Sequence, residues 1–249
     1  MTVTMSAPAS AQPEAMGELA RLTGVVWSPG QAFHDIAARP RWWPPIAIIV
    51  LLSLIFTYSF SQRVGYERFY RQQMETNSRT QNMDPAQREQ VIATQVKVAP
   101  YFFYGFSIVG TPLMAAVVAG IFLFLYRTLM GAQVSFRQVY AVYCYSLVPL
   151  IFSSIMGLAV MLLKDPDQFD LQNATLTNIG AFLDSVSTPK WLYSLASSID
   201  VFTLWTLALF ATGLSAAARK ISWSTSIMCV LGVWAVYVLI KMGVAAAFG

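Results

Sequence analysis

Residues 41–60 read RWWPPIAIIVLLSLIFTYSF, and this stretch decides the fold class of the chain. A basic residue and two tryptophans stand directly before two prolines, and an apolar run from Ile46 to Phe60 follows. Arginine and tryptophan favour the boundary between bilayer and water, and proline is well tolerated in the first turn of a helix. The pattern therefore predicts a helix over residues 42–61 that enters a membrane at its tryptophan pair.

The composition of the whole chain agrees with a membrane protein. Of its 249 residues, 56% are hydrophobic and only 11% are charged, whereas a soluble domain usually carries about a quarter charged residues. We expect an all-α protein in which residues 42–249 form a bundle of about five transmembrane helices. The predicted spans are residues 42–61, 101–126, 139–163, 191–214 and 223–246.

Two of these spans contain features that bear on their shape. In the second, Pro112 predicts a kink near Thr111. The fourth has a continuous apolar stretch only from Val201 to Leu214, which is shorter than the ~20 residues that a spanning helix needs. We therefore predict that this helix begins earlier, near Trp191.

Outside the spans, the sequence predicts three further segments. Residues 1–15 are small and polar and read as a disordered leader, without the apolar core of a signal peptide. Residues 16–41 have an amphipathic pattern that predicts a cytoplasmic, interfacial segment, with Ser28-Pro29 starting its second helix. Residues 62–99 are predicted to form a helical hairpin outside the membrane, whose second arm opens at Asp84-Pro85.

The distribution of charge predicts an orientation. Alternate links would place seven basic residues on the N-terminal face against three acidic ones, Glu14, Glu18 and Asp35, whereas the other face is balanced. The seven are Arg21, Arg39, Arg41, Arg127, Arg137, Arg219 and Lys220. The positive-inside rule then predicts a cytoplasmic N-terminus and an outside C-terminus, in what we expect to be a prokaryotic inner membrane. Because the basic residues sit singly at the ends of apolar runs, they indicate lipid headgroups rather than nucleic acid as the partner.

Three stretches together resemble the Yip family of Ypt/Rab-interacting integral membrane proteins, in its compact prokaryotic form. These are SPGQAF at 28–33 followed by IAARP at 36–40 and the tryptophan pair, YCYSLVP at 143–149, and DVFTLW at 200–205 with Gly213-Leu214 closing the same helix. The resemblance covers roughly residues 20–245 and implies a multi-pass membrane protein. Eukaryotic members act with small GTPases in vesicle traffic, but this sequence lacks their long acidic leader and Asp-Leu-Tyr-Gly-Pro motif, so the resemblance does not support GTPase binding here.

Asp200 is the candidate polar site within the spans. If the fourth helix begins near Trp191, Asp200 lies roughly 13 Å along it, where an unpaired carboxylate is costly. Lys241 in the fifth span would lie at a similar height, so an Asp200–Lys241 ion pair is one interpretation. The other is that Asp200 caps a helix that begins at the interface.

A second candidate site lies in the third span, where Tyr143, Tyr145, Ser146 and Pro149 follow one another closely. Tyrosines near the end of a span are typical of an interfacial aromatic belt. Alternatively, Tyr143 and Ser146 could line a polar cavity together with carbonyl groups freed by Pro149.

The N-terminal segment predicts a membrane-surface anchor. Trp27, Phe33 and Ile36 would insert into the interface, and Arg39 and Arg41 would lie near anionic headgroups.

No pattern in the sequence points to catalysis, a metal or a cofactor. His34 is the single histidine, and Cys144 and Cys229 fall within apolar runs without metal-ligand spacing. The pattern Asn173-Ala174-Thr175 matches a glycosylation acceptor, but such matches are frequent. We therefore expect a non-enzymatic membrane-organising or adaptor protein that contacts the bilayer and other membrane proteins. The alternative is a small transporter or channel component that uses the Asp200 site.

Overall fold

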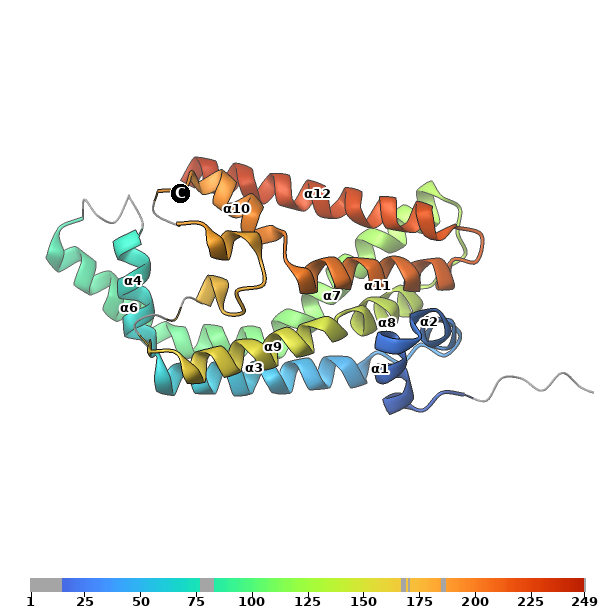
Figure 1. Cartoon of the computed structure of the whole chain (residues 1–249), viewed down its shortest axis with the longest axis horizontal. Coiled ribbons are helices and arrows are strands. Elements are labelled where there is room, and N and C mark those ends of the chain that lie inside the picture. The colour runs from blue at the N-terminus through green and yellow to red at the C-terminus, as the bar shows by residue number, and fades with distance from the viewer. Residues whose placement is uncertain (1–14, 77–82, 167–168, 170, 185–186, 249) are drawn as a thin grey trace, which may run out of the picture.

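The computed structural model describes residues 15–76, 83–166, 169, 171–184 and 187–248. The predicted leader therefore lies almost wholly outside the described residues. The described chain is helical, and its only β-type pairing is an isolated bridge between Asn178 and Asp200. The helices form an elongated bundle in which successive long segments run in alternating directions (Figure 1). This arrangement confirms the predicted all-α bundle.

Two short helices, α1 (Glu18–Trp27) and α2 (Pro29–Ala38), pack against one end of the bundle. As the sequence predicted, α2 begins at Pro29 directly after Ser28, although the Ser28 side chain makes no capping hydrogen bond. The links from the second to the third and from the fourth to the fifth long segment lie at this same end (Figure 1). We call it the α1–α2 end, and the opposite end the α4 end.

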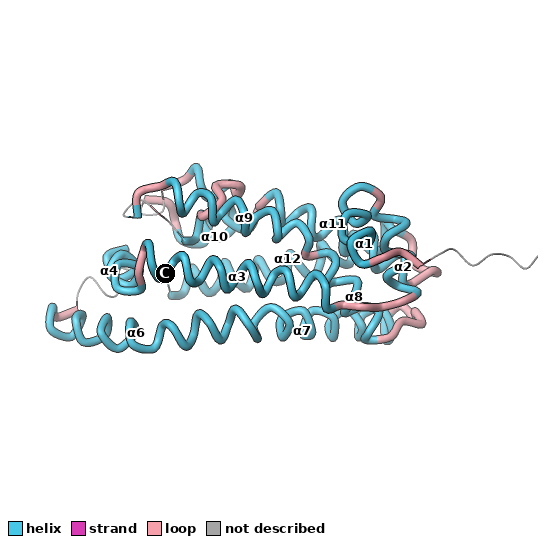
Figure 2. The backbone as a smooth tube through the Cα atoms, turned by 90° about the horizontal axis from the view of Figure 1, so that it is seen from below, coloured by secondary structure: helices cyan, strands magenta, loops and turns pink. Residues whose placement is uncertain are grey.

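The first long segment is α3 (Trp43–Arg63), which matches the span that the opening stretch predicted. It lies between α9 on one side and the α6–α7 segment on the other (Figure 2). At its far end the Arg63 guanidinium donates hydrogen bonds to the carbonyl oxygens of Met161 and Lys164, at 2.8 and 3.1 Å. Arg63 thus satisfies carbonyl groups at the C-terminal end of α9, which would otherwise lack partners within the helix.

The predicted hairpin outside the membrane consists of α4 (Tyr66–Thr76) and the first turns of α6 (Pro85–Gly105). Asp84 caps α6 as expected, because its side chain accepts a hydrogen bond from the Ala86 amide at 2.8 Å. The second arm does not end near residue 99 as predicted: α6 continues through a π-helical turn, Phe106–Gly110, into α7 (Thr111–Phe124). Pro112 lies just after this turn, so the helix is irregular where the sequence predicted a kink.

The third segment is divided into α8 (Phe136–Ser146) and α9 (Val148–Leu163), with the break at Leu147 and Pro149 in the first turn of α9. It starts three residues before the predicted Val139, because Ser135 and Gln138 form a reciprocal capping box that fixes the beginning of α8.

The fourth segment corrects the prediction of one continuous helix over residues 191–214. It consists of α10 (Lys190–Ser198) and α11 (Val201–Ala217), separated by extended residues at Ile199-Asp200. The backbone at this break pairs with the preceding loop, since the Ile179 amide donates to the Ile199 carbonyl and the Val201 amide to the Thr177 carbonyl. These loop contacts replace the hydrogen bonds that a continuous helix would make.

The fifth segment, α12 (Trp223–Phe248), packs against α10 and α11. Within the described residues, four helical stretches are long and apolar enough to cross a membrane, and α11 is a shorter apolar helix. The four stretches are Trp43–Arg63, Pro85–Leu129, Phe136–Leu163 and Trp223–Ala247. Many large apolar side chains on their outer faces are exposed, including Phe102, Leu113 and Ile240, which suits helices surrounded by lipid.

Candidate functional site

A buried group of charged residues connects α1, α2 and α8 at the α1–α2 end. Its centre is Arg21, whose side chain is only 2% exposed. The guanidinium lies 2.6 Å from the carboxylate of Asp35 on α2 and 3.6 Å from that of Glu18 on α1. The Tyr145 hydroxyl on α8 donates a hydrogen bond to Glu18 at 2.7 Å. We call Glu18, Arg21, Asp35 and Tyr145 the Arg21 cluster.

Local structure explains how these groups meet. Glu18 and Arg21 are three residues apart on α1 and therefore share one face of the helix. Burial by itself would lower the pKa of Arg21, but the hydrogen bond and the charge of Asp35, with a further contribution from Glu18, outweigh it. The pKa of Arg21 is therefore raised, and the guanidinium stays charged under physiological conditions.

Arg39 and Arg41 lie at the edge of the cluster. Arg39 is 3.4 Å from Asp35, and Arg41 is 3.1 Å from Glu18. Both arginines are exposed, so their attraction to these carboxylates is weakened by solvent. Trp27 is 83% exposed, as a side chain that reaches into a membrane interface would be.

Phe33 and Ile36 correct the membrane-anchor prediction. Both side chains are fully buried inside the protein, and α2 packs against α11 and α8. Gly213 on α11 makes this possible: a Cβ atom there would overlap Val142 and lie 2.7 Å from Phe33. The apolar face of α2 thus packs on the bundle and is not available to lipid.

The third-span residues form neither the predicted belt nor a shared polar site. Tyr145 is buried in the Arg21 cluster, whereas the ring of Tyr143 packs edge-on against Phe210 at 4.9 Å. The Ser146 hydroxyl donates to the Val142 carbonyl one turn earlier. Pro149 is buried in the first turn of α9. The sequence singled out Tyr145 but did not indicate its charged partners, and a functional role for these residues stays a prediction.

The predicted ion pair between Asp200 and Lys241 is not formed. Asp200 caps α11, because its carboxylate accepts hydrogen bonds from the Thr203 amide at 3.0 Å and from the Thr177 hydroxyl at 2.5 Å. Lys241 instead donates to the hydroxyls of Ser197 and Ser198, at 3.4 and 3.0 Å. The helix break at Ile199 explains the difference, since it turns Asp200 toward the loop that precedes α10.

The same loop contains the glycosylation-like pattern. Asn173 is buried, and its side-chain amide donates a hydrogen bond to the Tyr193 hydroxyl on α10. In this fold the amide therefore has a structural role and is not presented for modification.

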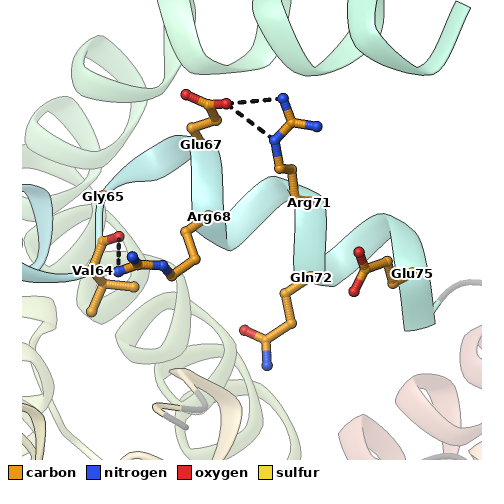
Figure 3. Close-up of a pocket in the computed structure, with 7 residues that line it drawn as sticks. All are labelled: Val64, Gly65, Glu67, Arg68, Arg71, Gln72 and Glu75. Atoms are coloured by element: carbon orange, nitrogen blue, oxygen red, sulfur yellow. Dashed lines mark hydrogen bonds and ion pairs between the residues drawn. The ribbon is translucent and has the colours of Figure 1, made fainter. Parts of the chain in front are cut away.

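At the α4 end, a hollow of about 640 Å³ lies beside α4 (Figure 3). It is lined by Val64, Gly65, Glu67, Arg68, Arg71, Gln72 and Glu75. Arg71 and Glu67 point toward α6, where Arg71 also binds Glu89 at 2.5 Å, and Arg68 points to the other side of α4. The hydrogen bonds that Arg71 donates to the carboxylates of Glu89 and Glu67 raise the pKa of its guanidinium. Its charge is thus used to join the two arms of the hairpin.

Sequence reasoning missed the Arg21 cluster. The available signals were the Glu18–Arg21 spacing and a lone acid, Asp35, on an otherwise amphipathic helix, but neither shows that the side chains are buried. In the described part of the chain, no group of three or more histidine, cysteine or acidic side chains is placed to bind a metal.

The comparison with protein families agrees with the resemblance in the sequence. No curated protein and no solved structure matches the chain. A family model for the Yip1 domain matches residues 23–245. This match runs from α1 to the last turns of α12 and thus includes Asp35, Tyr145 and the α10–α11 break. The chain is therefore a multi-pass membrane protein that belongs to the Yip1 domain family.

Proposed function

We propose that this chain is a non-enzymatic membrane adaptor whose α1–α2 pair is a rigid docking platform for other membrane proteins. The observation that carries the proposal is the Arg21 cluster. It joins α1 and α2 to α8 through a buried cation and two carboxylates. A platform that is already ordered loses less conformational entropy on binding than a flexible tail would lose.

The outward side of α2 supports a docking role. Gln31 and His34 are exposed there, while Phe33 and Ile36 point inward. Exposed polar groups on a fixed helix can make directional hydrogen bonds with a partner. We expect the platform to face the cytoplasm, since seven basic residues stand against three acidic ones on the face of the α1–α2 end, whereas the other face is balanced.

Affinity purification of the full chain from its native membrane tests this function. The Gln31→Ala/His34→Ala variant should lose partners that the unchanged chain captures, without a change in its thermal aggregation midpoint. The matched control is Gln87→Ala/Gln90→Ala, which changes two exposed residues of α6 at the other end. An identical set of captured proteins for all three chains would contradict the adaptor function.

A small transporter is the second candidate, and the α10–α11 break favours it. Interrupted helices often form substrate sites in transporters because their ends expose backbone groups. Here the break lies beside the half-buried cation of Lys241. Solute flux into proteoliposomes that disappears with Asp200→Asn, at unchanged protein incorporation, would support transport. Flux that is insensitive to this substitution would argue against it.

A further inference from the structure

The α1–α2 end of the bundle has an unusual distribution of charge. Four basic residues at this end are exposed and form no ion pair with a described residue. They come from three elements: the π-helical turn Leu125–Leu129, the first turn of α8, and the link between α11 and α12. We call Arg127, Arg137, Arg219 and Lys220 the basic surface.

The acidic residues of this end are paired with other arginines. Among the described residues, Glu18 and Asp35 are the acids at this end, and both contact the buried Arg21. Glu18 also accepts the hydrogen bond of Tyr145 from within the bundle. The Arg21 cluster thus holds the two carboxylates in place and leaves the basic surface without neutralising partners.

The α4 end provides a contrast within the same molecule. There Arg71 binds Glu67 and Glu89, and Arg63 binds carbonyl oxygens at the end of α9. Its described basic side chains are accompanied by a similar number of acids, so this end presents no comparable positive surface.

Apolar side chains lie at the same end as the basic surface. Trp27, Trp43, Leu129 and Phe136 are all exposed. Exposed tryptophans at the end of a bundle mark the level of the lipid headgroups. The basic surface is therefore placed where it meets the phosphate groups of one leaflet.

We propose that the basic surface binds the headgroups of anionic phospholipids. Arginine recognises phosphate through charge-assisted hydrogen bonds, which are stronger than bonds between neutral groups. An acidic protein could also supply negative charge to the basic surface. The exposed tryptophans favour a lipid as the ligand, because they mark the level of the headgroups. This inference goes beyond the adaptor function and does not depend on it.

The test compares full-length chains in mixed micelles that contain equal amounts of phosphatidylglycerol and phosphatidylcholine. The phospholipid retained by each chain is counted by native mass spectrometry. The variant Arg127→Gln/Arg219→Gln/Lys220→Gln removes three charges of the basic surface. Arg137 is left unchanged because its guanidinium also donates to the Pro40 carbonyl. The control Lys97→Gln/Lys164→Gln/Lys190→Gln removes three charges at the α4 end.

The unchanged chain and the control should retain phosphatidylglycerol preferentially, and the basic-surface variant should lose that preference by at least about tenfold. Retention by the unchanged chain should also fall with added salt. Equal loss in both variants, or no loss in either, would overturn the proposal. Absence of a lipid preference together with binding of polyglutamate to the basic surface would also overturn it. If the triple variant fails to fold, Arg127→Gln and Lys220→Gln are measured singly by the same criterion.

Discussion

At the scale of single residues, Arg21 decides how the N-terminal segment is held. A guanidinium taken out of water is costly unless its charge is compensated by nearby carboxylates and hydrogen bonds. Asp35 and Glu18 supply this compensation from two different helices, and Tyr145 fixes the position of Glu18 from a third. The cluster therefore couples the positions of α1, α2 and α8.

The substitution Arg21→Met should lower the free energy of unfolding by about 3 kcal/mol, because it leaves two partly buried carboxylates without their cation. The thermal aggregation midpoint in detergent measures this loss. Arg41→Gln is the control: Arg41 pairs with the same Glu18 but is exposed, so its removal should cost less than about 1 kcal/mol. Equal losses for the two variants would show that the Arg21 cluster does not stabilise the fold.

Asp200 provides a second prediction at this scale, because its carboxylate caps α11. Asp200→Ala should cost about 1 kcal/mol of stability, whereas Asp200→Asn should cost only a small part of that, since asparagine is an equally good capping residue. Combined with Lys241→Met, the loss from Asp200→Ala should be additive. A double variant that is more stable than the sum of the single losses would instead indicate an ion pair between the two residues.

At the scale of elements, α2 behaves as a helix inserted between two others. Phe33 and Ile36 pack on α8 and α11, and the main-chain approach at Gly213 leaves no room for a side chain. The hydrogen bond from the Gln138 side chain to the Ala37 carbonyl and that from Arg137 to Pro40 hold the end of α2 on α8. Apolar packing and polar contacts thus both hold α2 against α8 and α11.

Gly213→Ala should destabilise the chain by about 1–3 kcal/mol, because the new methyl group forces Phe33 or Val142 to move. We also expect faster trypsin cleavage after Arg41 when α2 separates from the bundle. Gly232→Ala is the matched control, since a Cβ atom at Gly232 on α12 meets open space. Unchanged protease protection in Gly213→Ala would contradict the tight packing of α2.

At the scale of the whole molecule, the path of the chain determines at which end of the bundle each terminal helix lies. The segments alternate in direction, so α1 and α2 lie at one end and the C-terminus at the other (Figure 1). The fourth segment, α10 with α11, differs from the four stretches that are long enough to span. α11 has 17 residues, about 25 Å at the α-helical rise, which is less than the ~30 Å hydrocarbon core. If the fourth segment crosses the membrane, α10 and the break before α11 supply the remaining length.

This path predicts that the two chain ends lie on opposite sides of the membrane. A reporter fused after Gly249 should be active on the non-cytoplasmic side, whereas a reporter fused at residue 10 should be active in the cytoplasm. Paired enzymatic reporters that function on only one side of the membrane provide the measurement. Activity of both fusions on the same side would show that the α10–α11 segment does not cross.

The sequence by itself determined the features that depend on neighbouring residues. The Trp42-Trp43 pair with Pro44-Pro45 located α3, Asp84-Pro85 located the start of α6, and Ser28-Pro29 located α2. Long apolar runs established the membrane class, and three motifs established the resemblance to the Yip family. These signals are readable because capping, proline geometry and transfer into lipid act over a single turn or a single helix.

Only the tertiary structure decided which distant groups meet. Arg21 and Asp35 are fourteen residues apart, and Glu18 and Tyr145 are 127 apart, so no local pattern shows that they form one buried cluster. Likewise, the apolar face of α2 has the same sequence pattern whether it contacts lipid or α11. At the break before α11, Asp200 and Val201 form hydrogen bonds with Thr177 in the preceding loop. These bonds take the place of those that a continuous helix from α10 into α11 would form. Burial and long-range pairing depend on the packed bundle, and the sequence pattern does not encode them locally.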